Sequence, residues 1–206
     1  MKGLSNDMEW EFQFLDWIQA HLRSGLMDTV MPFITSLGAV GWLQILVALL
    51  MFIPRRARKY AHVAAIALLI GLLLCNIVIK PMVARIRPYD VQQMVLLIRE
   101  PSDFSFPSGH TQASFAVATA LLMWKKRYGI PAMLLACCIA FSRMYLYVHY
   151  PTDVLAGIFI GVTDAFIGLW ICNRLFRNKP WDGCQGALPQ QTESETETER
   201  SVSDAG

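Results

Sequence analysis

Apolar residues form five long blocks along the chain, and short polar or charged stretches separate them. The blocks are Leu37–Ile53, Ala61–Ile79, Thr111–Trp124, Ile130–Val148 and Val154–Cys172. Each is close to the roughly 20 residues that an α-helix needs to cross a bilayer. The pattern predicts an all-α, multi-pass transmembrane helical bundle of about five spans. The block at Thr111 is short, so its helix must begin a few residues earlier, within a polar stretch.

The two ends of the chain depart from this pattern. Between residues 9 and 22, aromatic and aliphatic side chains alternate with polar and acidic ones, which suits a helix lying in the membrane interface. We favour an anchor over a cap on a functional site, because interfacial aromatics are common in membrane proteins. Beyond Pro180 the chain is too polar to bury a core. We predict an N-terminal interfacial helical segment (1–36), a transmembrane domain (37–178) and a disordered cytoplasmic tail (179–206).

The composition agrees with a membrane protein. Of the 206 residues, 54% are hydrophobic, more than a soluble domain needs to fill one core. The first 21 residues lack the basic start and continuous apolar stretch of a cleavable signal peptide, so insertion is expected to rely on the first span. We interpret the five cysteines, which match no metal-ligand spacing, as buried small apolar residues: Cys75, Cys137, Cys138, Cys172 and Cys184.

Positive charges predict the orientation, because cytoplasmic loops beside membrane spans collect Lys and Arg. Three clusters fall on one side under five crossings, at residues 55–59, 125–127 and 174–179. The N-terminus, the 80–110 connection and the 147–153 connection then face away from the cytoplasm. We therefore expect a plasma-membrane protein whose chemically interesting residues lie on the extracytoplasmic side.

The first group of such residues directly follows the second apolar block. It contains Lys80, Arg85, Arg87 and Pro88. Each cation alone could be an interfacial side chain that extends toward water. Together with Arg99, however, they put four cations into an outer connection, where the charge rule disfavours them. An anionic partner accounts for the excess.

The second group precedes the short block and runs Phe106-Pro107-Ser108-Gly109-His110-Thr111. A turn that leads into a helix start leaves backbone N–H groups unpaired at the positive end of the helix dipole, which favours an anion. Gly109 lets an anion approach the backbone, and Ser108 adds a hydroxyl donor. The alternative is that Ser108 is only a helix cap.

The third group joins the last two blocks and contains Arg143, His149, Pro151 and Asp153. Pro151 suits the first turn of a helix, where Asp153 could simply complement the dipole. That interpretation leaves His149 unexplained. A histidine held by a carboxylate through one ring nitrogen presents the other as a nucleophile or base.

Together, the three groups supply what phosphoryl transfer requires: cations and neutral donors for the phosphate oxygens, a nucleophile and an acid for the leaving group. No carboxylate cluster remains for a metal, so we expect no metal or other cofactor. The expected partners are a lipid phosphate or diphosphate and the lipid bilayer, without nucleic acid. Two further polar residues lie inside apolar blocks, Asn76 and Asp164. We expect both to face the bundle interior in a structural role, with a hydrogen bond between them as one arrangement.

The spacing of these groups resembles a known family. The motifs are Lys80-x6-Arg87-Pro88, then Pro107-Ser108-Gly109-His110, then Ser142-Arg143-x5-His149-x3-Asp153. This pattern is similar to the type 2 phosphatidic acid phosphatase superfamily, which shares its site with vanadium haloperoxidases and glucose-6-phosphatase. All three motifs are complete and in order.

The resemblance implies a role for each motif residue. His149 would attack phosphorus, Asp153 would orient it, and His110 would protonate the leaving oxygen, after which water would hydrolyse the phosphohistidine. The resemblance also implies a set of residues that hold the phosphate oxygens: Lys80, Arg87, Ser108, Gly109 and Arg143.

The lipid substrate is less well defined by the sequence. An outward-facing site suits undecaprenyl diphosphate, by analogy with the family. Phosphatidylglycerol phosphate or phosphatidic acid would use the same residues, and a phosphotransferase would pass the phosphoryl group to another acceptor. A haloperoxidase would be soluble, a hydrolase based on Ser108 would leave the cations unused, and a non-enzymatic lipid-binding protein would not need His110 and His149.

Overall fold

The computed structural model of the protein describes residues 6–176, and within this range every regular element is a helix. The elements are α1 (Asn6–Leu22), α2 (Gly25–Leu37), η1 (Ala39–Gly41), α3 (Trp42–Leu50), η2 (Arg55–Ala57), α4 (Arg58–Gly71), the π-helical η3 (Leu72–Ile79), α5 (Lys80–Val83), α6 (Pro88–Gln92), α7 (Gly109–Trp124), α8 (Lys126–Tyr145) and α9 (Pro151–Leu175). The predicted all-α bundle is confirmed. The predicted tail, 179–206, lies outside the described residues.

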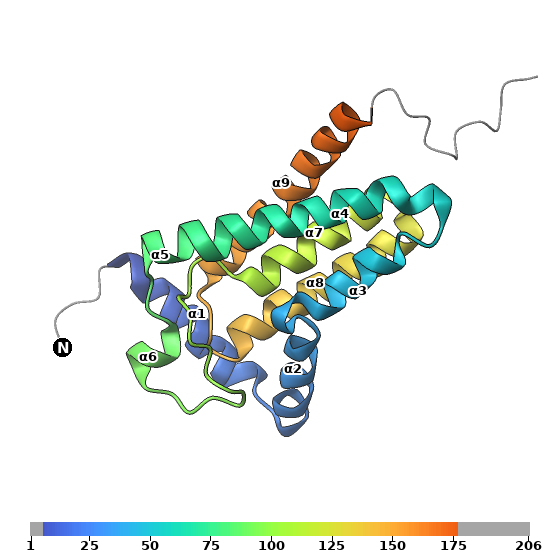
Figure 1. Ribbon diagram of the computed structural model, residues 1–206. Helices are drawn as coiled ribbons and strands as arrows, with labels where there is room; N and C mark the ends of the chain where they lie inside the picture. The colour runs from blue at the N-terminus through green and yellow to red at the C-terminus, as the bar shows by residue number, and fades with distance from the viewer. Residues whose placement is uncertain (1–5, 177–206) are drawn as a thin grey trace, which may run out of the picture.

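Helix α7 lies at the centre of the bundle and packs against α4, α8 and α9 (Figure 1). Nearly all of its residues from Thr111 to Leu121 are buried, and most of them are small. A helix that is covered on all sides belongs to the core and need not present an apolar surface to lipid. With 16 residues, α7 carries its first turn, which contains His110, to one end of the bundle.

Three glycines of α9 allow this close packing. An added Cβ atom would lie 2.7 Å from the Ser108 carbonyl oxygen at Gly157, 2.3 Å from the Gln112 oxygen at Gly161, and 2.8 Å from the Val63 oxygen at Gly168. Backbones can approach this closely only where side chains are absent. The start of α7 is thereby held beside the start of α9.

The expected count of five spans is not confirmed. Within residues 6–176, three helical stretches are long and apolar enough to cross a membrane, Arg55–Gln92, Lys126–Tyr145 and Pro151–Leu175, and the bent pair of α2 and α3 adds a fourth if it counts as one span. The expected first span is interrupted at Gly41, whose φ of +72° favours glycine.

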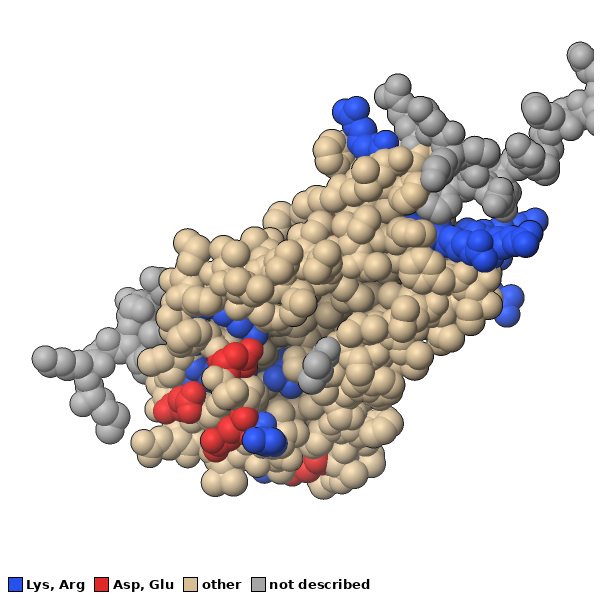
Figure 2. Space-filling view, viewed as in Figure 1, with Lys and Arg blue, Asp and Glu red and all other residues tan. Residues whose placement is uncertain are grey.

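The surface of the bundle is divided along its length. On the face shown in Figure 2, Lys and Arg gather at the end near the α3–α4 turn, charged residues of both signs lie at the other end, and uncharged residues cover the region between them.

Cys75 and Cys172 are buried as expected, but the prediction is wrong for Cys137 and Cys138, which are exposed. Cys184 lies outside the described residues.

Candidate active site

The three predicted motifs meet at the end of the bundle where α7 and α9 begin. Lys80 opens α5, Ser108 directly precedes α7, and Arg143 lies in the last turn of α8. Six of the predicted site residues are at most 6% exposed: Lys80, Arg87, Ser108, Arg143, His149 and Asp153. Buried charges at this density require partners.

His149 lies between a carboxylate and a guanidinium. Its Nδ1 atom is 3.4 Å from Asp153 Oδ2, and its Nε2 atom is 3.3 Å from Arg87 Nη1. A guanidinium can only donate, so this contact requires an unprotonated Nε2, with the ring proton on Nδ1 toward Asp153. The Nε2 lone pair therefore points toward a cation that can hold an anion.

The surroundings of His149 also decide its charge. Burial lowers the pKa of the His149 imidazole to about 3, and the positive charges of Arg87 and Arg143 act in the same direction, while the contact with Asp153 offsets only part of the effect. The ring is therefore neutral near pH 7. A neutral imidazole is the form that can act as a nucleophile.

Asp153 is held by several donors besides His149. Its Oδ1 atom accepts a hydrogen bond of 2.6 Å from Arg85 Nη1, and its Oδ2 atom accepts one of 2.9 Å from the Tyr150 backbone N–H and one from the Ser105 hydroxyl. Arg85 appeared in the sequence only as one cation of a group, and Ser105 was missed. A short polar loop residue outside a recognised motif gives no separate signal.

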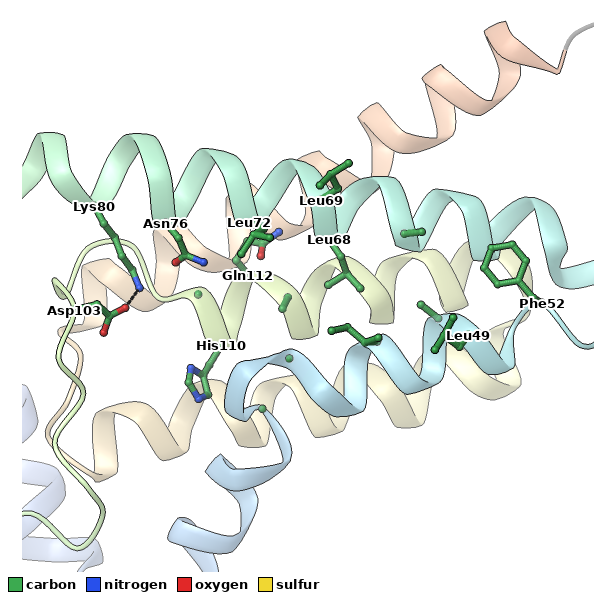
Figure 3. Close-up of a pocket in the computed structure, with 17 residues that line it drawn as sticks. Leu49, Phe52, Leu68, Leu69, Leu72, Asn76, Lys80, Asp103, His110 and Gln112 are labelled. Carbon is green, nitrogen blue, oxygen red and sulfur yellow. Dashed lines mark hydrogen bonds and ion pairs between the residues drawn. The ribbon is translucent and has the colours of Figure 1, made fainter.

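Asp103 was also missed in the sequence analysis. Its carboxylate binds Lys80 and Arg87, the two cations at the centre of the site. It forms an ion pair with Lys80 and accepts a hydrogen bond of 2.6 Å from Arg87 Nη2 (Figure 3). Burial alone would raise the pKa of Asp103, but Lys80 and Arg87 outweigh it and lower the pKa to about 2. An internal carboxylate thus lies against two of the cations that were predicted to hold phosphate.

Arg143 and Ser108 keep donors available. Arg143 Nη1 donates to Thr35 Oγ1 at 2.6 Å, whereas its buried Nε has no hydrogen-bond partner within residues 6–176. Ser108 Oγ accepts from Thr111 Oγ1 at 2.9 Å, which leaves its own hydrogen free to donate. Ser108 occupies the cap position of α7 without a side-chain bond to the helix backbone, so the cap alternative does not account for its hydroxyl.

His110 and Gly109 line a cavity of about 730 Å³ that begins at this charged cluster. The His110 ring lies within electrostatic range of Lys80, Arg87, Arg143 and His149. It approaches the α2–α3 break so closely that a Cβ atom at Gly38 would be 3.0 Å from its Cδ2 atom.

The rest of the cavity is mostly apolar and continues between α3 and α4 (Figure 3). Lys80, Asp103 and His110 form its polar end, and the apolar side chains that line it include Ile45, Leu49, Phe52, Leu68, Leu69 and Leu72. A charged end that continues into an apolar groove can accept an amphiphile with an anionic head.

The expected contact between Asn76 and Asp164 is wrong. Asp164 is buried and accepts a hydrogen bond of 2.7 Å from Gln112 Nε2, whereas Asn76 is exposed and lines the cavity. The central helix α7 places Gln112 next to Asp164. Gly71 makes room for the amide, since a Cβ atom there would lie 1.7 Å from Gln112 Nε2.

Comparison with known proteins agrees with this geometry. The family model of the PAP2 superfamily matches residues 59–177. Undecaprenyl-diphosphatase BcrC of Bacillus subtilis is 31% identical over 145 residues, 70% of this chain and 75% of the relative.

Two solved structures are similar at 27% identity. Aquifex aeolicus LpxE superposes with a TM-score of 0.70 over 82% of this chain and 99% of its own. The first transmembrane PAP2 type phosphatidylglycerolphosphate phosphatase from Bacillus subtilis gives 0.67 over 85% and 90%. With the motifs gathered at one end of an apolar helical bundle, these matches show that the chain belongs to the PAP2 superfamily and is a membrane lipid phosphatase.

Proposed function

We propose that this phosphatase hydrolyses undecaprenyl diphosphate to undecaprenyl phosphate through a covalent phosphohistidine on His149. The observation that carries the chemistry is the placement of His149, whose Nδ1 faces Asp153 and whose Nε2 faces Arg87. This arrangement directs a neutral nucleophile toward a bound anion.

In the first step, His149 Nε2 attacks the terminal phosphorus, the P–N bond forms and the P–O bond to the lipid phosphate breaks. The negative charge of the bound phosphate favours a proton on His110, which passes to the leaving oxygen. Asp153 stabilises the positive charge that develops on the His149 ring. In the second step, water attacks phosphorus, His110 accepts its proton, the P–N bond breaks and inorganic phosphate leaves.

The phosphate oxygens would be held by the side chains of Lys80, Arg87, Arg143 and Ser108 and by the backbone at Gly109. Arg143 supports this role because its buried Nε still lacks an acceptor within residues 6–176. Lys80 and Arg87 bind Asp103, and they become available when the phosphate displaces this carboxylate or binds the two cations beside it. Charge-assisted hydrogen bonds of this kind stabilise the charge on a phosphoryl group in transfer.

The apolar part of the cavity supports a lipid substrate. It begins at Lys80 and His110 and follows α4 to Ala65, 15 residues away, which corresponds to roughly 22 Å along a helix. An isoprenoid or acyl chain can lie in this groove while its phosphate stays at the charged end.

Two arguments favour undecaprenyl diphosphate. The chain resembles an undecaprenyl-diphosphatase over 70% of its length. The clusters of Lys and Arg at 55–59 and 125–127 lie at the end of the bundle opposite the site. By the charge rule, this supports a site on the outer side of the plasma membrane and a C-terminal tail in the cytoplasm. Phosphatidylglycerol phosphate, phosphatidic acid and transfer to another acceptor remain the alternatives, since one solved relative acts on the first of these.

The test is phosphate release from a panel of lipid phosphates and diphosphates in detergent with a chelator present. Wild type should be fastest on undecaprenyl diphosphate, and His149→Ala should be inactive. Substrate labelled in the terminal phosphate should leave an acid-labile, base-stable label on wild type alone. Activity of His149→Ala, or loss of wild-type activity with the chelator, would refute the mechanism; Ser108→Ala should weaken activity without abolishing it.

A further inference from the structure

The N-terminal helix α1 contributes a buried glutamate, Glu11, that binds Arg85, and Arg85 in turn binds Asp153. Glu11 of α1 is only 2% exposed and forms an ion pair with Arg85. Its Oε1 atom accepts hydrogen bonds from the Thr152 hydroxyl at 2.5 Å and the Thr152 backbone N–H at 3.3 Å. A carboxylate is rarely buried this completely without a function in the structure or the chemistry.

Arg85 connects this glutamate to the site. Its Nη1 atom donates to Asp153 Oδ1 at 2.6 Å and to Thr152 Oγ1 at 2.7 Å, while its Nη2 atom contacts Glu11. The guanidinium carbon also lies 3.8 Å from the centre of the Tyr150 ring. A planar guanidinium that binds two carboxylates and stacks on an aromatic ring is held in one orientation. Arg85 therefore holds Glu11 and Asp153 in fixed positions relative to each other.

We propose that Glu11 is a positioning residue of the active site, which holds Arg85 and Thr152 so that Asp153 keeps both its orientation and its charge toward His149. This inference rests on the proposed function, in which Asp153 stabilises the charged His149 ring. The N-terminal helix is then part of the catalytic apparatus in addition to any role as an anchor.

The buried cluster of Glu11, Arg85 and Asp153 has a charge balance that favours a positive His149 ring. Arg85 alone would neutralise Asp153 and weaken its attraction for a positive charge on His149. With Glu11 on its other side, the three groups Glu11, Arg85 and Asp153 carry a net charge of −1, since two carboxylates face one guanidinium. A net negative cluster stabilises the His149 ring when it bears a phosphoryl group.

The rest of α1 holds Glu11 in place. Phe12, Leu15 and Ile18 are buried in a cluster with the tyrosines of the α8–α9 connection, and the Phe12 and Tyr150 rings meet edge to face at 5.4 Å. Gln19 Nε2 donates to the Tyr145 carbonyl at 2.6 Å. An anchor that only held the protein to the membrane would need none of these contacts.

The test compares Glu11→Gln with Glu9→Gln, an identical change at an exposed position of the same helix. We expect Glu11→Gln to lower kcat on undecaprenyl diphosphate by about tenfold or more, the size typical of partners that orient a functional side chain. KM should stay within about twofold, because Glu11 is remote from the phosphate. Glu9→Gln should match wild type.

A double variant tests the route through Arg85. If Glu11 acts through it, Glu11→Gln with Arg85→Gln should be no slower than the slower single variant, whereas independent roles would multiply. The double variant leaves no unpaired charge at either position, so it also serves if Glu11→Gln fails to fold. In that case Arg85→Gln alone should already lie at least about tenfold below Glu9→Gln in kcat, and the double variant should lose no more; a wild-type kcat in Arg85→Gln would overturn the route through Arg85.

Two outcomes would overturn the proposal: wild-type kcat in Glu11→Gln, with or without a lowered Tm, or equal losses of kcat in Glu11→Gln and Glu9→Gln. Active His149→Ala in the same assay would instead refute the proposed function. The two failures are thus distinguishable.

Discussion

The site has two sides that differ in how completely their hydrogen bonds are satisfied. The nucleophile side, named for the role that we propose for His149, consists of His149, Asp153, Arg85 and Ser105. There, each oxygen of Asp153 is occupied and both ring nitrogens of His149 have neighbours. The phosphate side consists of Lys80, Arg87, Asp103, Ser108, His110 and Arg143. There, Arg143 keeps an unpartnered nitrogen among the described residues, Ser108 has a free hydroxyl hydrogen, and the cavity begins.

The difference separates the groups proposed to carry out the reaction from the groups proposed to bind the phosphate. A nucleophile and its carboxylate gain from fixed geometry, because reorganisation during the reaction costs rate. Groups that bind an anion need donors that are unused, as on Arg143, or donors whose present partner can give way to the anion, as Asp103 can at Lys80 and Arg87. Changes on the nucleophile side should therefore affect kcat, and changes on the phosphate side should affect the binding of substrate and inhibitors.

Asp153→Asn should give the largest effect, a loss of about a thousandfold in kcat with little change in KM, because the ring of His149 loses its orientation and charge compensation. Steady-state kinetics on purified protein measures it. Asp164→Asn is the matched control, a buried aspartate of the same helix whose described partner is Gln112, and it should stay within about threefold of wild type. Equal losses would mean that Asp153 acts only through stability.

Arg143→Lys should lower kcat/KM by about ten- to a hundredfold while the protein still folds. Lysine keeps the charge but cannot offer Nε and Nη1 donors in a fixed fork. The inhibition constant of orthovanadate should rise in parallel, because vanadate would use the same donors. A change in kcat alone, with unaltered vanadate inhibition, would move Arg143 to the nucleophile side.

Asp103→Asn should lower the inhibition constant of inorganic phosphate by about three- to tenfold, because the anion no longer competes with a carboxylate for Lys80 and Arg87. Product inhibition assays measure this directly. Asp90→Asn, an exposed change in the same connection, should have no effect. Weaker inhibition in Asp103→Asn would indicate that Asp103 orders the two cations for phosphate.

The protonation of His149 and that of Asp103 should destabilise the protein in different pH windows. The pKa of His149 falls from its usual 6.5 to about 3 in the folded protein, so between these values the unfolded chain binds a proton that the folded chain does not, and stability falls as pH falls. For Asp103 the same loss occurs between pH 3.8 and about 2. In Tm measurements, His149→Gln should reduce the decline that begins below pH 6.5. It should not abolish it, because burial and nearby positive charges also lower the pKa of His110 to about 2. Asp103→Asn should reduce only the decline below pH 4.

Gly38→Ala should give the smallest effect, a fall of about two- to fivefold in kcat. Its Cβ atom would lie 3.0 Å from His110 Cδ2 and 3.1 Å from Ile139 Cγ2, so the imidazole must shift by a few tenths of an ångström. At Gly25 an added Cβ would meet no described atom within 4 Å, so Gly25→Ala is the control. An unchanged rate would show that the acid tolerates this displacement.

The sequence predicted the helical class correctly because that class depends on local patterns, and the residues of its three motifs lie together at one end of the bundle. Apolar blocks of bilayer length predict helices, and Lys80, Ser108 and His149 lie in motifs of fixed spacing. The excess of outer cations was attributed to an anionic partner, but the structure shows that carboxylates of the protein itself bind some of them. Arg85 pairs with Glu11 and Asp153, and Lys80 with Asp103, so internal carboxylates supply part of the inferred anionic partner.

Other contacts depend on how distant segments pack, which hydrophobic patterns do not encode. Glu11 lies 141 residues before Thr152 in sequence, and in the helical pattern it counted only as one of the polar positions of an amphipathic helix. Thr35 likewise meets Arg143 from 108 residues away. The span count is not confirmed, and one reason is local: Gly41 breaks an apolar block that composition alone treats as continuous.

The position of the cavity determines whether the reaction rate follows the concentration of substrate in the membrane or in the bulk solution. Several lining residues between α3 and α4 are also exposed on the outside of the bundle, among them Ile45, Leu49, Leu69 and Leu72. A lipid can therefore enter sideways from the membrane without passing through water. Under the proposed function, turnover should follow the mole fraction of substrate in the bilayer or micelle, and adding inert detergent at constant total substrate should slow the reaction.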